Sequence, residues 1–211
     1  MSDTKDLEEK YGLSYHVNYA NYAEQLVGLK GKRILEVGGS LPRDFVFQEL
    51  GVAQWLALEE MDYWDETLST GHVSGTPPPL EQVKNYFQKA TPSELKEYNL
   101  YHGRIEDLPP AFEGFFDVVF SIAAFEHIVH LPEALEKMYC ALRPGGKLFS
   151  LFAPIWSTYN GHHLPAIEDK AGNIWSCSNV PIPPWFHLIM RPMELYDHLC
   201  GQCDKETARR L

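Results

Sequence analysis

Up to residue 153, short apolar runs alternate with segments in which apolar residues recur at helical spacing. The apolar runs predict five β-strands, at 33–37, 54–58, 100–102, 115–122 and 147–153. The segments between them predict helices at 42–50, 80–89, 92–98 and 132–142. Such alternation is typical of an α/β fold in which one parallel sheet carries helices on both faces. The sequence therefore predicts a doubly wound parallel sheet.

Glycine, proline and capping residues mark the ends of several of these elements. Gly38 and Gly39 follow the first strand and precede a helix, which gives a strand, a glycine turn and a helix in succession. Thr91 and Glu94 have the spacing of a capping box, so the helix at 92–98 is expected to begin there. The sequence RPGG at 143–146 is typical of a helix end.

The chain is predicted to be a single domain, residues 1–211, around a core at 32–154. Residues 61–79 are polar and rich in glycine and proline, which indicates an inserted loop. Residues 155–187 show little periodicity and are rich in Trp, His, Pro and Asn, which favours a lid or substrate segment. A last helix is predicted at 192–199.

Composition restricts the classes of partner. Hydrophobic residues make up 45% of the 211 positions and charged residues 22%, so the chain can bury a sizeable core. Its 29 acidic and 18 basic residues give a net charge of −11, which repels a phosphate backbone or an anionic membrane. We therefore expect neither nucleic acid nor a membrane to be a partner.

We expect a cytoplasmic protein. The first ten residues, MSDTKDLEEK, lack the basic start and the apolar stretch of a secretory signal. Four cysteines are too few for a disulfide framework and are expected to stay reduced. Cys200 and Cys203 form a single CxxC pair, which supplies too few ligands for a structural zinc site, so no metal site is predicted.

Two acidic residues at strand ends suggest the kind of ligand. The turn reads Glu36, Val37, Gly38, Gly39, and it lacks the G-x-G-x-x-G pattern that holds a pyrophosphate. An acid before the turn favours a ligand that carries positive charge. Glu59 ends the second strand, where a carboxylate can accept hydrogen bonds from both hydroxyls of a ribose. Together they point to an adenosine ligand with cationic groups, although without the surrounding motifs each acid is better explained as a solvated strand end.

With these motifs in place, residues 32–154 resemble the class I S-adenosylmethionine-dependent methyltransferases, a Rossmann-like family. The resemblance rests on Glu59 and on four segments in order, ILEVGGS (34–40), GRIEDLP (103–109), FDVVFSIAAFEHI (116–128) and LRPGGKLF (142–149). It implies S-adenosylmethionine as the cofactor. The cofactor-binding residues that it implies are Glu36, Gly38, Gly39, Ser40, Glu59, Ile105, Glu106 and Ser121.

The chain departs from the family in the turn and at its end. Ser40 and Pro42 stand where glycines are common, and Arg104 stands where an acid is common. The terminal antiparallel hairpin of the family is missing, so the fifth strand would be an exposed edge. A homodimer through that edge, the terminal segment or a continuation beyond a truncated chain would each cover it.

Four histidines are candidate general bases for methyl transfer: His127, His162, His163 and His187. His127 follows the fourth strand and could instead orient its loop, and the other three could be structural. A divalent metal held by some of them with Glu168 or Asp169 is an alternative. Aromatic residues of the same region form either a wall that excludes water or a minor core: Trp156, Tyr159, Trp175, Trp185 and Phe186.

The sequence predicts an S-adenosylmethionine-dependent methyltransferase that acts on a small molecule by in-line displacement. A non-catalytic relative that keeps the fold for binding or assembly is one alternative, favoured by the departures at Ser40, Pro42 and Arg104. A nicotinamide-dependent oxidoreductase is another, and the missing phosphate-binding pattern disfavours it.

Overall fold

The structure is a computed structural model of the chain, and it falls into two compact units. It describes residues 4–39, 41–61, 83, 87–153, 155, 157–161, 167–175, 179 and 181–210. The described residues up to 152 form the first unit and those from 153 to 210 the second. The single domain expected over residues 1–211 stays a prediction.

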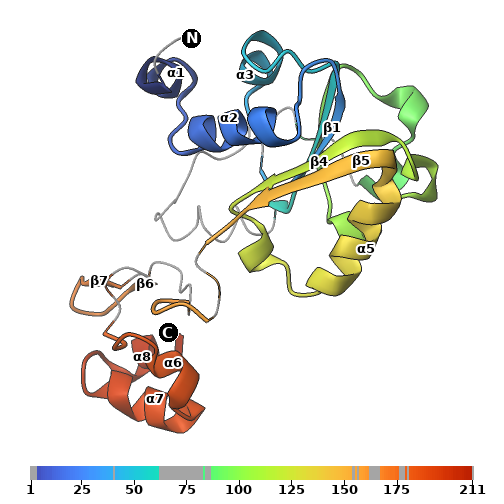
Figure 1. The fold of residues 1–211 in the computed structure, drawn as a ribbon. Helices are drawn as coiled ribbons and strands as arrows, with labels where there is room; N and C mark the ends of the chain where they lie inside the picture. The colour runs from blue at the N-terminus through green and yellow to red at the C-terminus, as the bar shows by residue number, and fades with distance from the viewer. Residues whose placement is uncertain are drawn as a thin grey trace. The chain divides into compact units, whose positions relative to one another are not determined.

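The first unit is built on one parallel sheet. Its strands are β1 (Arg33–Val37), β2 (Gln54–Glu59), β3 (Tyr98–His102), β4 (Phe116–Ile122) and β5 (Leu142–Leu151). They lie in the order β3-β2-β1-β4-β5, so the sheet grows outward from β1 in two directions (Figure 1). Nearly every residue of β1, β2 and β4 is buried, as expected for strands covered on both faces. The predicted parallel α/β sheet is confirmed.

Helices cover both faces of this sheet (Figure 1). On one face lie α2 (His16–Leu26) and α3 (Arg43–Gln48), whose apolar side chains share a core cluster with Trp55 and Phe120. On the other face, α5 (Leu131–Ala141) contributes Ala134, Met138 and Ala141 to a second cluster. A further helix, α1 (Thr4–Tyr11), packs beside α2. The doubly wound arrangement is therefore confirmed.

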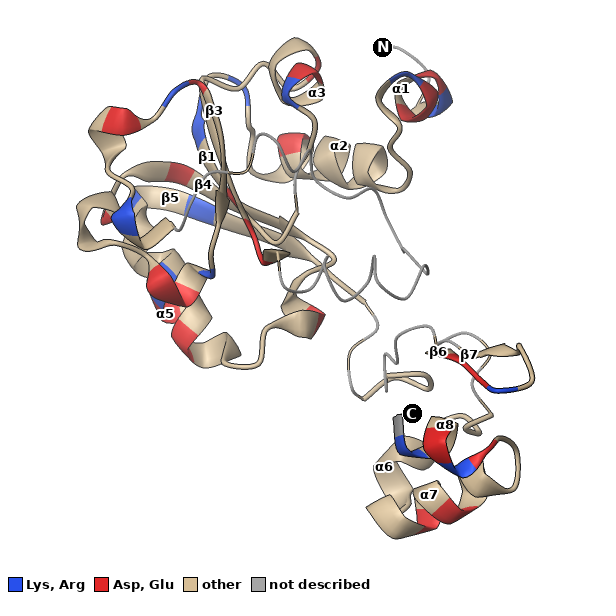
Figure 2. Ribbon diagram, turned by 180° about the vertical axis from the view of Figure 1, so that it is seen from behind, with Lys and Arg blue, Asp and Glu red and all other residues tan. Residues whose placement is uncertain are grey.

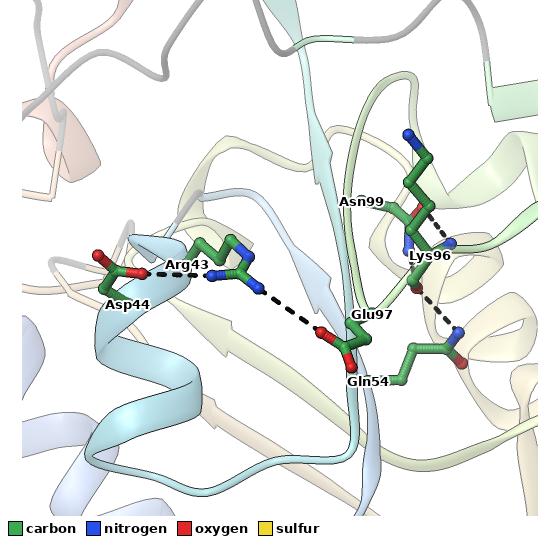
Figure 3. Close-up of polar contacts among 6 residues, drawn as sticks. All are labelled: Arg43, Asp44, Gln54, Lys96, Glu97 and Asn99. Carbon is green, nitrogen blue, oxygen red and sulfur yellow. Dashed lines mark hydrogen bonds and ion pairs between the residues drawn. The ribbon is translucent and has the colours of Figure 1, made fainter.

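The helix predicted at 92–98 is wrong beyond its first turn. A short 3-10 turn, η3 (Pro92–Glu94), begins at the expected capping box, where the Thr91 N–H donates to Glu94 Oε2 over 3.2 Å. The chain then extends, because the side chain of Gln54 and that of Asn99 both donate to the Lys96 carbonyl, over 3.0 and 2.7 Å. Figure 3 shows these contacts at the start of β3, which begins two residues earlier than predicted.

The remaining predicted elements agree in outline. The predicted helix at 132–142 corresponds to α5, whereas RPGG at 143–146 lies within the bounds of β5, where the pairing with β4 shifts register. Of the helix predicted at 80–89, the structure describes Val83 and the turn η2 (Phe87–Lys89). Only Met61 of the predicted loop at 61–79 lies within the described residues.

The second unit is small. It contains an antiparallel pair, β6 (Ile167–Glu168) and β7 (Ile174–Trp175), and three helices, α6 (Phe186–Ile189), α7 (Pro192–Cys200) and α8 (Lys205–Arg210). Helix α7 confirms the prediction at 192–199, whereas the strand pair and α8 were not predicted. The pair forms a sheet of its own, so among the described strands β5 remains an edge of the main sheet.

Acidic residues are spread over α1, α5 and α7 of the two units (Figure 2). Within the described part of the chain, no helix combines the length and the apolar character that a membrane span requires.

Candidate functional site

The carboxyl ends of the central strands are the place where this fold offers a binding site. The strand order reverses between β1 and β4, and open parallel sheets bind ligands outside the carboxyl ends at such a reversal. Gly38 follows β1, Glu59 ends β2, Gly103 follows β3 and Ala123 follows β4. These four positions define the candidate site.

The turn after β1 needs glycine for two reasons. Gly38 and Gly39 have φ of +69° and +141°, and residues other than glycine rarely adopt such backbone conformations. A Cβ atom at Gly38 would overlap that of Ala124 in the loop after β4, and one at Gly39 would lie 3.1 Å from Glu36 Oε1. The missing side chains therefore let parts of the protein itself come together at this turn.

Glu36 lies beneath the turn and is only 3% exposed. Its carboxyl group accepts a hydrogen bond from the indole Nε1 of Trp55, over 2.8 Å, and from the backbone N–H of Leu41, over 3.2 and 3.3 Å. Burial raises the pKa of Glu36 to about 8, although both hydrogen bonds favour the charged form. The group is thus protonated for the most part at neutral pH.

Glu59 sits between two glycine turns. It is 6% exposed and pairs with His102 of β3, while the residue before it, Leu58, pairs with Val37 at the end of β1, directly before Gly38. The Gly38 N–H donates to the Leu58 carbonyl over 3.0 Å, and the Gly103 N–H donates to the Glu59 carbonyl over 3.1 Å. A carboxyl group flanked by turns without side chains fits a vicinal diol such as that of ribose. The acceptor at Glu59 therefore fits the ribose of an adenosine ligand.

Three of the other predicted cofactor residues are described, and they lie in different settings. Ile105 is buried in the second core cluster, and Glu106 is half-buried on the turn η4 (Ile105–Asp107). The Ser121 hydroxyl donates to the Val37 carbonyl over 2.7 Å and so ties β4 to the end of β1. Ser40 lies outside the described residues. The cofactor-binding roles of these residues stay predictions.

Arg104, one of the departures from the family pattern, has a partner next to the site. Its guanidinium pairs with the carboxylate of Glu60, and the contact from Nε is 2.8 Å long. Glu60 directly follows Glu59, so this ion pair borders the end of β2.

The structure places one candidate general base in the loops of the first unit. His127 is exposed on the turn η6 (Phe125–His127), which follows β4. His187 is buried on α6 in the second unit. His162 and His163 lie outside the described residues. A catalytic role for any of them stays a prediction.

The aromatic segment and the metal alternative concern the second unit. Phe186 packs against its small core, while Tyr159 and Trp185 meet edge to face with ring centroids 6.2 Å apart. Both Asp169 carboxylate oxygens accept hydrogen bonds within their own hairpin, from Asn173 and Trp175 among others. The described residues contain no group of three or more side chains suited to a metal ion. Trp156 lies outside them.

Three residues at the site were missed by the reasoning from sequence: Trp55, Tyr98 and Ala124. The signal for the first two was available, because a buried indole N–H or phenol hydroxyl needs a hydrogen-bond partner. The Tyr98 hydroxyl donates to the Leu41 carbonyl over 2.9 Å. Nothing in the sequence pointed to Ala124, since its contact with Gly38 depends on how two distant strands are paired.

Comparison with known proteins links the chain to a family of enzymes and to a curated relative. Residues 58–150 match the family described as "Methyltransferase domain". A tRNA U34 carboxymethyltransferase of Syntrophotalea carbinolica is 29% identical over 132 residues. That alignment covers 63% of this chain and 35% of the relative, so the chain spans about a third of that protein's length.

Several solved structures are also similar. A complex of the Haloferax volcanii Trm112 methyltransferase activator with a putative methyltransferase has a TM-score of 0.43 and 18% identity, covering 70% of this chain and 54% of the other. An S-adenosylmethionine-dependent methyltransferase from Mesorhizobium loti has a TM-score of 0.43 and 15% identity, with 77% and 64% covered. A putative one from Methanococcus maripaludis has 0.45 and 13%, with 71% and 63% covered.

Proposed function

We propose that the chain, in which residues 58–150 match a methyltransferase domain, is a class I, S-adenosylmethionine-dependent enzyme that transfers a methyl group to a small-molecule acceptor. The cofactor would lie at the carboxyl ends of β1, β2 and β4. The observation that carries this assignment is the buried Glu59 carboxyl group between the turns at Gly38 and Gly103, beside the strand reversal. When bound, S-adenosylmethionine supplies a methyl group already activated by a positively charged sulfur.

The residues of the first unit would then have separate tasks. Glu59 would accept the hydrogen bonds of the ribose hydroxyls, and the turn at Gly38 and Gly39 would lie beside the cofactor. Holding the acceptor in line with the methyl group supplies much of the rate of such a displacement. An acceptor that must lose a proton also needs a base, and His127, after β4, is the base we propose in the first unit.

A small acceptor is supported by the charge of the chain. The net charge of −11 disfavours a polyanionic substrate, whose binding depends largely on basic side chains. The relative's name is the observation that favours a second candidate, transfer to tRNA. The two candidates differ in a measurable way, because transfer to tRNA should weaken steeply as salt is raised and transfer to a small molecule should not.

Calorimetric titration tests the cofactor assignment. We expect S-adenosylmethionine and its demethylated form, S-adenosylhomocysteine, to bind with one site each, and NAD not to bind. A bound ligand also raises the unfolding temperature. NAD binding alone would favour the oxidoreductase, and binding of none of the three would favour the non-catalytic relative. Transfer of labelled methyl groups from the cofactor to a small-molecule extract or to purified tRNA then identifies the acceptor class.

A further inference from the structure

Leu41, two residues beyond the glycine turn, is held by hydrogen bonds at both of its backbone polar groups. Its N–H donates to the Glu36 carboxyl group, and its carbonyl accepts from the Tyr98 hydroxyl over 2.9 Å. The Leu41 side chain is 2% exposed in the first core cluster. This residue joins the turn to α3, so its position fixes where the turn ends.

The two side chains that donate to Glu36 and Leu41 come from adjacent strands. Trp55 and Tyr98 are directly paired in the register of β2 and β3, so their side chains lie on the same face of the sheet. The Trp55 indole is fully buried and donates to Glu36, while Tyr98 reaches Leu41. Tyr98 thus acts directly on the segment between β1 and α3, and Trp55 acts on it through the Glu36 carboxyl group, which accepts from Leu41.

Helix α3 also contacts the start of β3 through an ion pair. Arg43, its first residue, pairs with Glu97 over 3.5 Å, and Glu97 directly precedes Tyr98 (Figure 3). This surface ion pair is weak by itself. It shows, however, that the segment from Leu41 to Arg43 lies against the start of β3.

We propose that Trp55 and Tyr98 are positioning residues. Through Glu36 and Leu41 they hold the turn at Gly38 and Gly39 in the conformation that binds S-adenosylmethionine. The assignment rests on the proposed function. Neither residue needs to touch the cofactor, because each acts on the backbone or carboxyl group that shapes the turn. The proposal differs from the role expected of Glu36 from the family resemblance, since Glu36 supports the turn from beneath.

The same contacts make cofactor binding depend on whether the Glu36 carboxyl group carries a proton. Burial raises the pKa of Glu36 to about 8, and the nearby charge of Glu59 on β2 contributes to this rise. Tyr98 is the ionisable neighbour on β3, the paired residue on β4 is Phe120, and Arg43 and Asp44 of α3 are exposed.

A cation at the turn favours the ionised carboxyl group. The sulfonium of S-adenosylmethionine carries that charge, and S-adenosylhomocysteine lacks it. Affinity for the first should therefore rise with pH up to about pH 8, by up to about tenfold per unit, and affinity for the second should rise less.

The experiment compares three conservative variants by calorimetry with both ligands between pH 6 and pH 9. Trp55→Phe removes the indole donor, and Tyr98→Phe removes the hydroxyl on Leu41. Tyr101→Phe is the matched control, because Tyr101 lies on the same strand but belongs to the core cluster on the opposite face. Hydrogen exchange of the Leu41 amide in the ligand-free protein gives a readout that needs no cofactor.

Each variant has a distinct expected result. Trp55→Phe should weaken S-adenosylmethionine binding by about tenfold and move the midpoint of its pH dependence upward, because the ionised Glu36 loses a donor. Tyr98→Phe should weaken binding by roughly threefold to tenfold and speed exchange at Leu41, with the midpoint unmoved. Tyr101→Phe should match the unaltered protein within about twofold.

The outcomes separate this inference from the proposed function. Binding by both variants as tight as that of Tyr101→Phe, with Leu41 exchange unchanged, would overturn the positioning roles and leave the methyltransferase assignment intact. Failure of the unaltered protein to bind S-adenosylmethionine would overturn both. If Trp55→Phe does not fold, Tyr98→Phe decides by itself, since it removes one partly buried oxygen atom.

Discussion

The methyl group of Ala124, in the loop after β4, occupies the space that a side chain at Gly38 would fill at the end of β1. Both segments have unusual backbone conformations, because Gly38 has φ of +69° and Ala123, before Ala124, has φ of +50°. An alanine at positive φ is uncommon and indicates local strain held by its surroundings. The need for glycine at position 38 is therefore set by contact between two strand ends, before any ligand is considered.

Gly38→Ala should lower the free energy of unfolding by about 2–4 kcal/mol, from the overlap with Ala124 and the positive φ together. The double variant Gly38→Ala/Ala124→Gly should recover the part due to overlap. Gly114→Ala is the control for conformation alone, because Gly114 has φ of +65° and open space around its missing Cβ. Denaturant unfolding of the three variants measures these terms. Equal losses for Gly38→Ala and Gly114→Ala would show that the overlap is relieved without cost.

Glu59→Gln should weaken S-adenosylmethionine binding by about 1–3 kcal/mol, since the change removes the charge of an acceptor of two hydrogen bonds. The neighbouring Glu60→Gln is the control, because the Glu60 side chain is 40% exposed and pairs with Arg104. Calorimetry at one pH compares the two. Equal affinity in both variants would remove the ribose role from Glu59.

The sheet could be predicted because its strands are covered on both faces, so the runs at 33–37 and 54–58 are mostly apolar and do not alternate with polar residues. The glycine turn was visible for a similar reason, since Gly38 and Gly39 follow such a run directly. The extension of 95–97 could not be predicted from helical spacing, because side chains of β2 and β3 hold the Lys96 carbonyl.

Contacts between strand ends that are distant in the sequence also could not be predicted. The family resemblance implies that Gly38 binds the cofactor, whereas the structure shows that Ala124 stands where a Gly38 side chain would go. The placement of Glu36 likewise depends on Trp55, which lies on the next strand. Residue types and spacing indicate which strand ends matter, whereas register decides which side chains meet there.

Asp117→Asn should lower the free energy of unfolding by about 1–2 kcal/mol at neutral pH. Burial alone would raise the pKa of Asp117, but the Arg33 N–H, at 2.7 Å, and the Arg143 guanidinium outweigh burial and hold that pKa below its usual value. A carboxyl group with a lowered pKa stabilises the fold above its unfolded pKa, and this contribution is lost as pH falls. The variant should therefore differ more at pH 7 than at pH 3 in denaturant unfolding, whereas exposed Glu113→Gln should differ at neither.

Glu36→Gln should remove a fall in stability that the unaltered protein shows as pH rises. With a pKa of about 8 in the folded state and the ordinary value of 4.5 when unfolded, Glu36 binds a proton in the folded protein that the unfolded chain has released. Stability then declines between about pH 4.5 and pH 8, by up to about 1.4 kcal/mol per pH unit, and becomes level above that range. Glutamine keeps an oxygen for the Leu41 N–H and the Trp55 indole but cannot ionise. Denaturant unfolding at several pH values should show a flatter profile for the variant, with its largest relative gain near pH 8. A slope equal to that of the unaltered protein would mean that Glu36 ionises normally in the fold.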